Sequence, residues 1–265
     1  MLTRIISGAV MIVIVVAVLL LNAVNPAITI GFLAILAGIA VYEILNNTGI
    51  VAKKTISISA AVFAALYVLF NFYLNSYTVV LVTAFVLCTT VCALIFHKDF
   101  KVNAISAAIA FPIMISVAFC SIYTLFGGYG LPYFLLMLNF SSVCDCGAYF
   151  VGVALGRHKL CPEISPKKTV EGAVGGIVSS IIVTVIIVLC FRLTEKLIPL
   201  LIITPVLCAV GMVGDLFASV IKRNTGIKDY GHLIPGHGGI LDRFDSILLI
   251  APIFVQILKI MEAVG

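Results

Sequence analysis

The feature that most constrains this chain is a succession of long apolar segments separated by short polar ones. About nine such segments occur, each close to the roughly 20 residues that a helix needs to cross a bilayer. They cover residues 5–24, 27–45, 56–74, 77–96, 104–126, 131–154, 171–191, 197–220 and 244–262. Only 10% of the 265 residues are charged, whereas soluble domains carry roughly 25%. We therefore predict an all-α, polytopic membrane protein with about nine transmembrane helices.

The distribution of Lys and Arg predicts how the chain is oriented. When the loops alternate from a cytoplasmic N-terminus, thirteen of the 16 basic residues fall in cytoplasmic loops, as the positive-inside rule favours. This orientation places the C-terminus outside and the two long loops, residues 155–170 and 221–243, in the cytoplasm. The net charge of +5 therefore reflects topology and suits phosphate-bearing or anionic lipid partners rather than nucleic acid.

The same pattern divides the chain into two regions. Residues 1–126 are expected to form about five N-terminal helices, and residues 127–265 form a C-terminal region that holds both long loops. Because functional residues concentrate on loops held by a rigid scaffold, we expect the functional site in the C-terminal region, on the cytoplasmic side. The internal repeat typical of many transporters is not visible in the sequence.

The most informative stretch begins at Asp215 and ends at Asp245. Asp215 and Lys222 share one helix face, because residues seven apart lie two turns from each other. The glycine-rich run at 235–239 can bring backbone N–H groups close to an anion. It leads to Asp242 and Asp245, spaced i, i+3 near the start of the last predicted helix. Carboxylates hold Mg²⁺, and Mg²⁺ together with Lys and Arg neutralises phosphate oxygens, so this stretch indicates phosphoryl chemistry.

A second stretch, Ser165-Pro166-Lys167-Lys168, lies in the first long loop. Ser165 followed by Pro166 predicts the start of a helix, with proline at the first helical position. Two lysines beside the positive end of a helix would make an anion site. Because the stretch is predicted on the same membrane face as Asp215, we interpret it as part of the same site.

Two other acidic residues lie within apolar segments. Asp145 is treated as a functional candidate, because an ionisable residue inside a membrane span is costly unless it faces a partner. Cys144 and Cys146 flank it, but no histidine or second cysteine pair completes a metal–thiolate site. Glu43 lies near the end of its segment and is predicted to be interfacial.

From Ser219 to Asp245 the sequence resembles the signature of the phosphatidate cytidylyltransferases, also called CDP-diglyceride synthases. The charged positions of the pattern K-R…K-D…P-G-H-G-G…D-R…D are all filled. Two further stretches, S-P-K-K-T-x-E-G and D-x-x-A-Y-F-x-G, are similar to the family and occur in the same order. Together these stretches cover about the C-terminal half, and the N-terminal helices match in hydropathy only. Cys144 and Cys146 depart from the family, where small polar residues are expected.

The resemblance implies the reaction of CTP with phosphatidic acid to give CDP-diacylglycerol and pyrophosphate. It implies dependence on Mg²⁺, with a monovalent ion such as K⁺ as a second cofactor, and a homodimeric assembly. It also implies an active site that faces the cytoplasm. The short chain, without a long soluble N-terminal extension, favours a bacterial plasma membrane.

Carried over by position, the metal ligands fall on three acidic residues, Asp215, Asp242 and Asp245. With Lys222 and Arg223 they form the predicted catalytic set. The predicted substrate-binding residues are Asp145, Ser165, Lys167, Lys168, Lys228, Asp229, His237, Gly238, Gly239 and Arg243.

Two other functions remain open at this point. One is a CTP-dependent lipid kinase of the dolichol or phytol type, which would transfer the γ-phosphoryl group to an alcohol; the complete G-H-G-G-x-x-D-R-x-D run argues against it. The other is a transporter of a phosphorylated solute, against which the asymmetric loops and the lack of a repeat argue.

Overall fold

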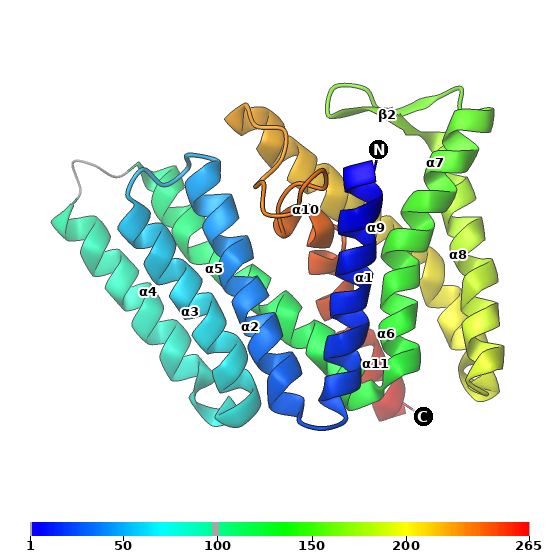
Figure 1. Ribbon diagram of the computed structural model, residues 1–265, viewed down its shortest axis with the longest axis horizontal. Helices are drawn as coiled ribbons and strands as arrows, with labels where there is room; N and C mark the ends of the chain where they lie inside the picture. Colours follow the sequence, from blue (N-terminus) through cyan, green and yellow to red (C-terminus); the bar gives the residue numbers. More distant parts are fainter. Residues whose placement is uncertain (1, 97–100, 265) are drawn as a thin grey trace. The chain divides into compact units, whose positions relative to one another are not determined.

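The computed structural model describes residues 2–96 and 101–264, and it is helical almost throughout (Figure 1). Its internal contacts divide the chain into two compact units. Unit 1 consists of Met1–Tyr123 and Asn224–Phe244, and unit 2 consists of Thr124–Arg223 and Asp245–Gly265. The loop after α9, which the sequence analysis assigned to the C-terminal region, therefore packs with the N-terminal helices.

Unit 1 is a bundle of long apolar helices. Small side chains lie where α2, α3 and α5 meet: Ala37, Ala40, Ala60, Ala64 and Ala118 are fully enclosed. Such residues let helix backbones approach closely inside a membrane. The elements of this unit are α1 (Leu2–Asn22), α2 (Pro26–Tyr42), the π-helical turn η1 (Glu43–Asn47), α3 (Lys54–Tyr73), the 3₁₀ turn η2 (Asn75–Tyr77), α4 (Thr78–Ile95), α5 (Val102–Tyr123) and the short α10 (Leu241–Phe244).

Unit 2 is a second helical bundle that carries the protein's two β-strands among the described residues. Asn139 is buried and donates from Nδ2 to the carbonyl oxygen of Ser180 and to Oγ1 of Thr184, each at 3.0 Å. The elements are η3 (Thr124–Tyr129), α6 (Leu131–Leu138), η4 (Asn139–Val143), α7 (Cys144–Leu155), β1 (Lys159–Cys161), β2 (Ser165–Thr169), α8 (Val170–Cys190), η5 (Thr194–Lys196), α9 (Leu197–Thr225) and α11 (Ile247–Val264).

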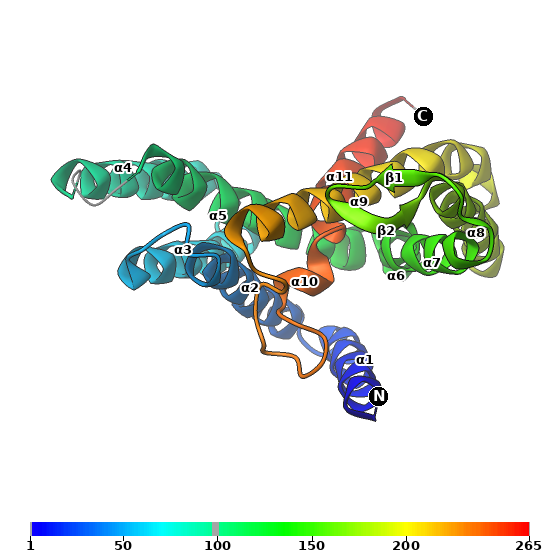
Figure 2. The ribbon, with the colours of Figure 1, turned by 90° about the horizontal axis from the view of Figure 1, so that it is seen from above.

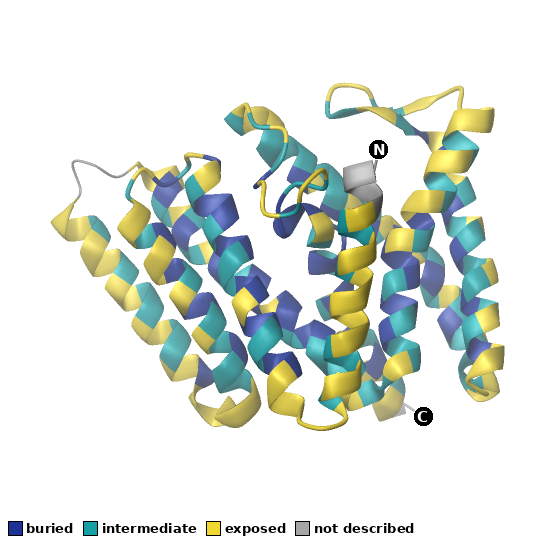
Figure 3. Cartoon of the chain, in the orientation of Figure 1, coloured by how far each residue is buried: buried dark blue, intermediate teal, exposed yellow. Residues whose placement is uncertain are grey.

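Apolar side chains cover much of the outer surface, as expected where lipid is the solvent. Figure 3 shows long exposed stretches on α1 and α4, and these stretches include Ile12, Val13 and Leu20 on α1 and Val79 and Leu87 on α4. The predicted class, an all-α integral membrane protein, is confirmed.

Within the described residues, seven helices are long and apolar enough to cross a membrane. They are Pro26–Asn47, Lys54–Tyr73, Asn75–Ile95, Val102–Tyr129, Leu131–Leu155, Val170–Cys190 and Thr194–Thr225. A shorter apolar helix, Ile6–Asn22, lies in the first predicted segment, and α11 lies in the ninth. The count of nine spans and the orientation of the termini stay predictions.

The predicted helix start at Ser165 is wrong. Ser165–Thr169 forms strand β2, which pairs antiparallel with β1 through Lys159 opposite Thr169 and Cys161 opposite Ser165. Pro166 is tolerated because each strand of a two-stranded sheet keeps a free edge. Helix α8 begins at Val170, where Thr169 is the N-cap and its Oγ1 accepts the N–H of Gly172 at 3.1 Å.

Glycines determine how closely α7 and α8 pack. A Cβ added at Gly176 would lie 2.5 Å from the carbonyl oxygen of Cys144, and one added at Gly172 would lie 2.7 Å from the carbonyl oxygen of Ala148. Because backbone atoms cannot yield as a flexible side chain can, larger residues would push the two helices apart.

We expect Gly176→Val to lower the thermal unfolding midpoint of the detergent-solubilised protein by about 5 °C, since overpacking costs about 1–3 kcal/mol. Gly31→Val on α2 is the matched control, because a Cβ there has no neighbour within 4 Å. Equal midpoints for the two variants would contradict the packing argument.

Candidate functional site

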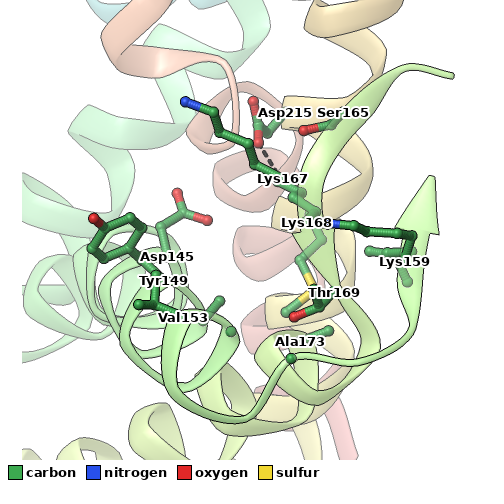
Figure 4. Close-up of a pocket in the computed structure, with 15 residues that line it drawn as sticks. Asp145, Tyr149, Val153, Lys159, Ser165, Lys167, Lys168, Thr169, Ala173 and Asp215 are labelled. Atoms are coloured by element: carbon green, nitrogen blue, oxygen red, sulfur yellow. Dashed lines mark ion pairs between the residues drawn. The ribbon is translucent and has the colours of Figure 1, made fainter. Parts of the chain in front are cut away.

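A cleft of about 630 Å³ opens in unit 2 against α7, the β1–β2 hairpin and α9 (Figure 4). We call it the hairpin cleft. Five predicted site residues that lie far apart in the sequence meet in its lining: Asp145, Ser165, Lys167, Lys168 and Asp215. Lys159 and Tyr149 add a further cation and a phenol, which the sequence analysis did not single out.

The hairpin cleft contains both cationic and anionic side chains, which attract one another. The ammonium of Lys168 forms an ion pair with Oδ2 of Asp215. Asp145 is attracted to Lys168 and repelled by Asp215, and Figure 4 shows both carboxylates at the same cleft. The two side chains of the ion pair are about one quarter exposed. The cleft therefore combines cations suited to phosphate oxygens with carboxylates suited to a hard metal ion.

The hairpin is tied to the helices at its base. The carboxylate of Glu171 accepts the backbone N–H of Arg157 at 3.0 Å and that of His158 at 3.2 Å. The His158 ring nitrogen Nδ1 lies 2.6 Å from Oε1 of the same carboxylate. A Cβ at Gly152 would lie 3.0 Å from Oγ1 of Thr169, so α7 passes directly beside the start of α8. Lys167 and Lys168 thus project from a backbone that is held at both ends.

Asp245 lies in the turn between α10 and α11 rather than in the last helix itself. Its Oδ1 accepts the N–H of Ser246 at 2.8 Å. Burial raises the pKa of the Asp245 carboxyl to about 6, helped by repulsion from Asp215 and opposed by the nearby Lys222. Within unit 2, Asp245 and Asp215 therefore repel each other electrostatically.

No three Asp, Glu, His or Cys side chains in the described part of the chain converge closely enough to form a complete metal site. The donor types nevertheless fit Mg²⁺, which prefers carboxylate oxygens and keeps several waters when bound. Asp215 also already pairs with a cation, the ammonium of Lys168. Asp215 and Asp245 are the residues of unit 2 that could hold such an ion.

The second group of predicted residues belongs to unit 1 and lies on the loop before α10. We call residues 226–240 the glycine loop; Figure 2 shows it near α1 and α2. Gly236 (φ 76°) and Gly238 (φ 86°) adopt left-handed conformations that glycine reaches without strain. The Ile234 N–H donates to the Gly238 carbonyl at 2.9 Å and closes the turn.

Asp242 holds the glycine loop together. Its Oδ2 accepts the N–H of Tyr230 at 2.8 Å and that of Gly239 at 3.0 Å, and its side chain is buried. His237 contacts Oγ of Ser7 on α1 through Nδ1 at 2.8 Å. The structure thus gives Asp242 and His237 roles in loop structure, in addition to the roles predicted for them.

The remaining predicted residues lie near these two groups along the chain. Lys222 and Arg223 lie in the last turn of α9 and belong to unit 2, and Arg223 is exposed. In unit 1, Lys228 and Arg243 are exposed and Asp229 is half-buried. Of the predicted metal ligands, Asp215 and Asp245 belong to unit 2 and Asp242 belongs to unit 1.

The structure encloses Glu43 within unit 1, whereas the interfacial depth predicted for it stays a prediction. Its side chain is only 4% exposed, and it accepts the backbone N–H of Ile240 at 3.1 Å and that of Leu241 at 2.9 Å. The sequence does indicate that Glu43 needs a partner, because it is a carboxylate in an apolar span, as Asp145 is. Its partners lie almost two hundred positions further along the chain, where local pattern gives no guide.

The fold and the cleft define an integral membrane protein with a lysine- and aspartate-lined site suited to phosphate groups. The sequence matches the model of the cytidylyltransferase family over residues 2–261. Because this match covers nearly the whole chain, the protein belongs to the cytidylyltransferase family.

Curated relatives carry a more specific name. The chain is 43% identical over 134 residues to the phosphatidate cytidylyltransferase of Bacillus subtilis (strain 168). These aligned residues cover 51% of this chain and 50% of that protein. The chain is 44% identical over 124 residues to the phosphatidate cytidylyltransferase of Staphylococcus saprophyticus, covering 47% and 48%. The protein of that name from Staphylococcus epidermidis is 41% identical over 124 residues, with the same coverage. The chain thus spans about half the length of the curated relatives it matches.

We expect Thr169→Val to destabilise the base of the hairpin, since valine keeps the shape of the side chain but loses the bond to the Gly172 N–H. The loss of an N-cap costs about 1 kcal/mol and should lower the thermal midpoint by about 2 °C. Thr90→Val on α4 is the control, because Thr90 is exposed and bonds only within its helix, to the Val86 carbonyl. A decrease in the thermal midpoint equal to that of Thr90→Val would contradict the capping role of Thr169.

Proposed function

We propose that this protein is a phosphatidate cytidylyltransferase, which converts CTP and phosphatidic acid into CDP-diacylglycerol and pyrophosphate. The observation that carries the proposal is the hairpin cleft, which brings Lys167 and Lys168 beside Asp145 and Asp215 in an integral membrane protein. Membership of the cytidylyltransferase family and the names of the bacterial relatives support it.

The chemistry needs charge to be screened more than it needs a strong base. The nucleophile is a phosphate oxygen of phosphatidic acid, which is already largely anionic at neutral pH. This oxygen bonds to the α-phosphorus of CTP, the bond from that phosphorus to the bridging oxygen breaks, and the electron pair leaves with pyrophosphate. Lys167 and Lys168 would hold phosphate oxygens and offset the repulsion between the two anions.

Among the residues of this chain, Asp215 and Asp245 are the proposed ligands of Mg²⁺, and Asp242 is the third predicted ligand. Bound Mg²⁺ would supply positive charge to the phosphate oxygens and the departing pyrophosphate. Lys168 pairs with Asp215 in the structure, and we propose that it turns to a substrate phosphate when the site is filled. A second, monovalent ion such as K⁺ remains part of the proposal through the family resemblance.

The proposal also includes location and assembly. We infer a bacterial plasma membrane, with the site facing the cytoplasm, from which CTP arrives while the acyl chains of the lipid stay in the bilayer. The bias of basic residues towards the predicted cytoplasmic loops and the bacterial origin of the relatives support this orientation. A homodimer is proposed from the family resemblance.

The reaction can be tested on protein purified in detergent, given phosphatidic acid, Mg²⁺ and CTP labelled with ³²P at the α-phosphate. Label should move into the extracted lipid and should stay in the aqueous phase when EDTA is present. We expect Asp215→Asn and Asp242→Asn each to lower turnover by at least about 100-fold while membrane insertion is unchanged. Glu195→Gln, an exposed change in unit 2, is the matched control.

Each negative outcome has a distinct meaning. Near-normal turnover by the aspartate variants would refute the metal assignment. Transfer of label from γ-labelled CTP to a lipid alcohol, with none from α-labelled CTP, would identify a lipid kinase. Uptake of a phosphorylated solute into liposomes without covalent change would identify a transporter.

The proposed phosphate contact of Lys168 makes a separate prediction. Lys168→Met should raise KM for at least one substrate about tenfold, since a hydrogen bond to a charged group contributes about 1.5–3 kcal/mol. Lys196→Met, which removes a cation from the η5 turn in the same unit, should leave both KM values unchanged. Equal effects of the two changes would indicate a general charge effect instead of a contact in the cleft.

A further inference from the structure

The π-helical turn η1 at the end of α2 holds the glycine loop by two side chains. π-helical turns within α-helices are uncommon and frequently occur at functional sites. Glu43 begins this turn and Asn47 ends it. Both side chains bond to the glycine loop or to the residue that follows it, and the mechanism proposed above uses neither of them.

The two side chains bond to the loop at two separate places, Tyr230 and its C-terminal end. Asn47 donates from Nδ2 to the carbonyl oxygen of Tyr230 at 2.7 Å. Glu43 accepts the N–H of Ile240 through Oε1 and the N–H of Leu241 through Oε2. Each carboxylate oxygen therefore has its own backbone donor, which compensates for burying the charge.

The loop leaves space for this carboxylate. A Cβ added at Gly231 would lie 2.5 Å from Oε1 of Glu43, and one added at Gly239 would lie 2.4 Å from Oε2. Any other residue at these two positions would displace the Glu43 side chain. The glycines of the loop therefore allow a contact with η1 as well as the loop's own turns.

The backbone that these contacts hold also bonds to Asp242 or directly precedes it. Tyr230 bonds to Asn47 through its carbonyl and to Asp242 through its N–H. Leu241, whose N–H Glu43 accepts, directly precedes Asp242 in the chain. The π-turn and Asp242 thus hold the same short backbone from two sides, and a shift of that backbone would move the Asp242 carboxylate.

We propose that Glu43 is a positioning residue for the transfer reaction: it fixes the glycine loop through the Ile240 and Leu241 amides and so sets the orientation of Asp242. This inference rests on the proposed function, because it assigns Glu43 to the same reaction. Glu43 contacts no substrate in this scheme and acts only through the loop.

Glu43→Gln tests the inference with little change in shape. The amide replaces one acceptor with an NH₂ group, which would face a backbone N–H, so one of the two bonds is lost. We expect kcat to fall about tenfold while KM for CTP and for phosphatidic acid stays within about twofold, as for a group needed in the transition state. Ser116→Ala is the matched control, since Ser116 is buried in unit 1 but bonds to Pro112 within α5, far in sequence from the loop.

Hydrogen–deuterium exchange gives a readout that does not depend on activity. In Glu43→Gln the amides of peptide 229–241 should exchange at least about tenfold faster, while those of α3 and α5 keep their wild-type rates. Asn47→Ala is a milder second variant, should Glu43→Gln fail to fold, and should accelerate the same peptide. Because both residues hold one loop, their effects on kcat should be less than additive in the double variant.

The two readouts separate the possible failures. Faster loop exchange together with a lower kcat and unchanged KM supports the inference. Unchanged loop exchange, or faster exchange with wild-type kcat, overturns it. If the wild-type protein transfers no cytidylyl group, the proposed function fails, and the exchange experiment by itself still decides whether Glu43 holds the loop.

Discussion

A carboxylate enclosed by apolar helices must be matched by donors or cations, because an uncompensated charge is very costly to remove from water. This constraint explains the local structure around three acids of the protein, Glu43, Asp242 and Asp215. Glu43 is matched by two backbone amides, Asp242 by two more, and Asp215 by the ammonium of Lys168. The acids differ in one respect that matters for function: backbone donors are permanent, whereas a lysine can exchange its partner.

That difference suggests a division of roles. Glu43 and Asp242 bond to amides of the glycine loop and thereby define its conformation. Asp215 pairs with the side chain of Lys168, and Asp245 has a raised pKa because it is partly buried close to Asp215. These two acids are the ones in unit 2 to which the proposal assigns a metal ion.

Sequence reasoning succeeded where the determining interactions are local or depend on composition. Hydropathy predicted the helical membrane class, and the residues Asp145, Lys167, Lys168 and Asp215, identified separately, do line one cleft. It failed at Ser165, because serine followed by proline resembles a helix start, and only the pairing with β1 shows that the segment is a strand. It missed the contacts of Glu43, because the amides that make its burial acceptable belong to residues 240 and 241 and no local pattern reveals them.

The route of the chain gives these contacts a further consequence. The chain leaves unit 2 after Arg223, packs in unit 1 as the glycine loop and α10, and returns to unit 2 at Asp245. Asp242 and Asp245 are only three residues apart, yet the first is held by bonds within unit 1 and the second interacts with Asp215 in unit 2. Within unit 1, the contact of Glu43 with the loop therefore connects the N-terminal helices to Asp242 through a short piece of backbone. By the route proposed here, a substitution at Glu43 in η1 would alter the reaction without contacting either substrate.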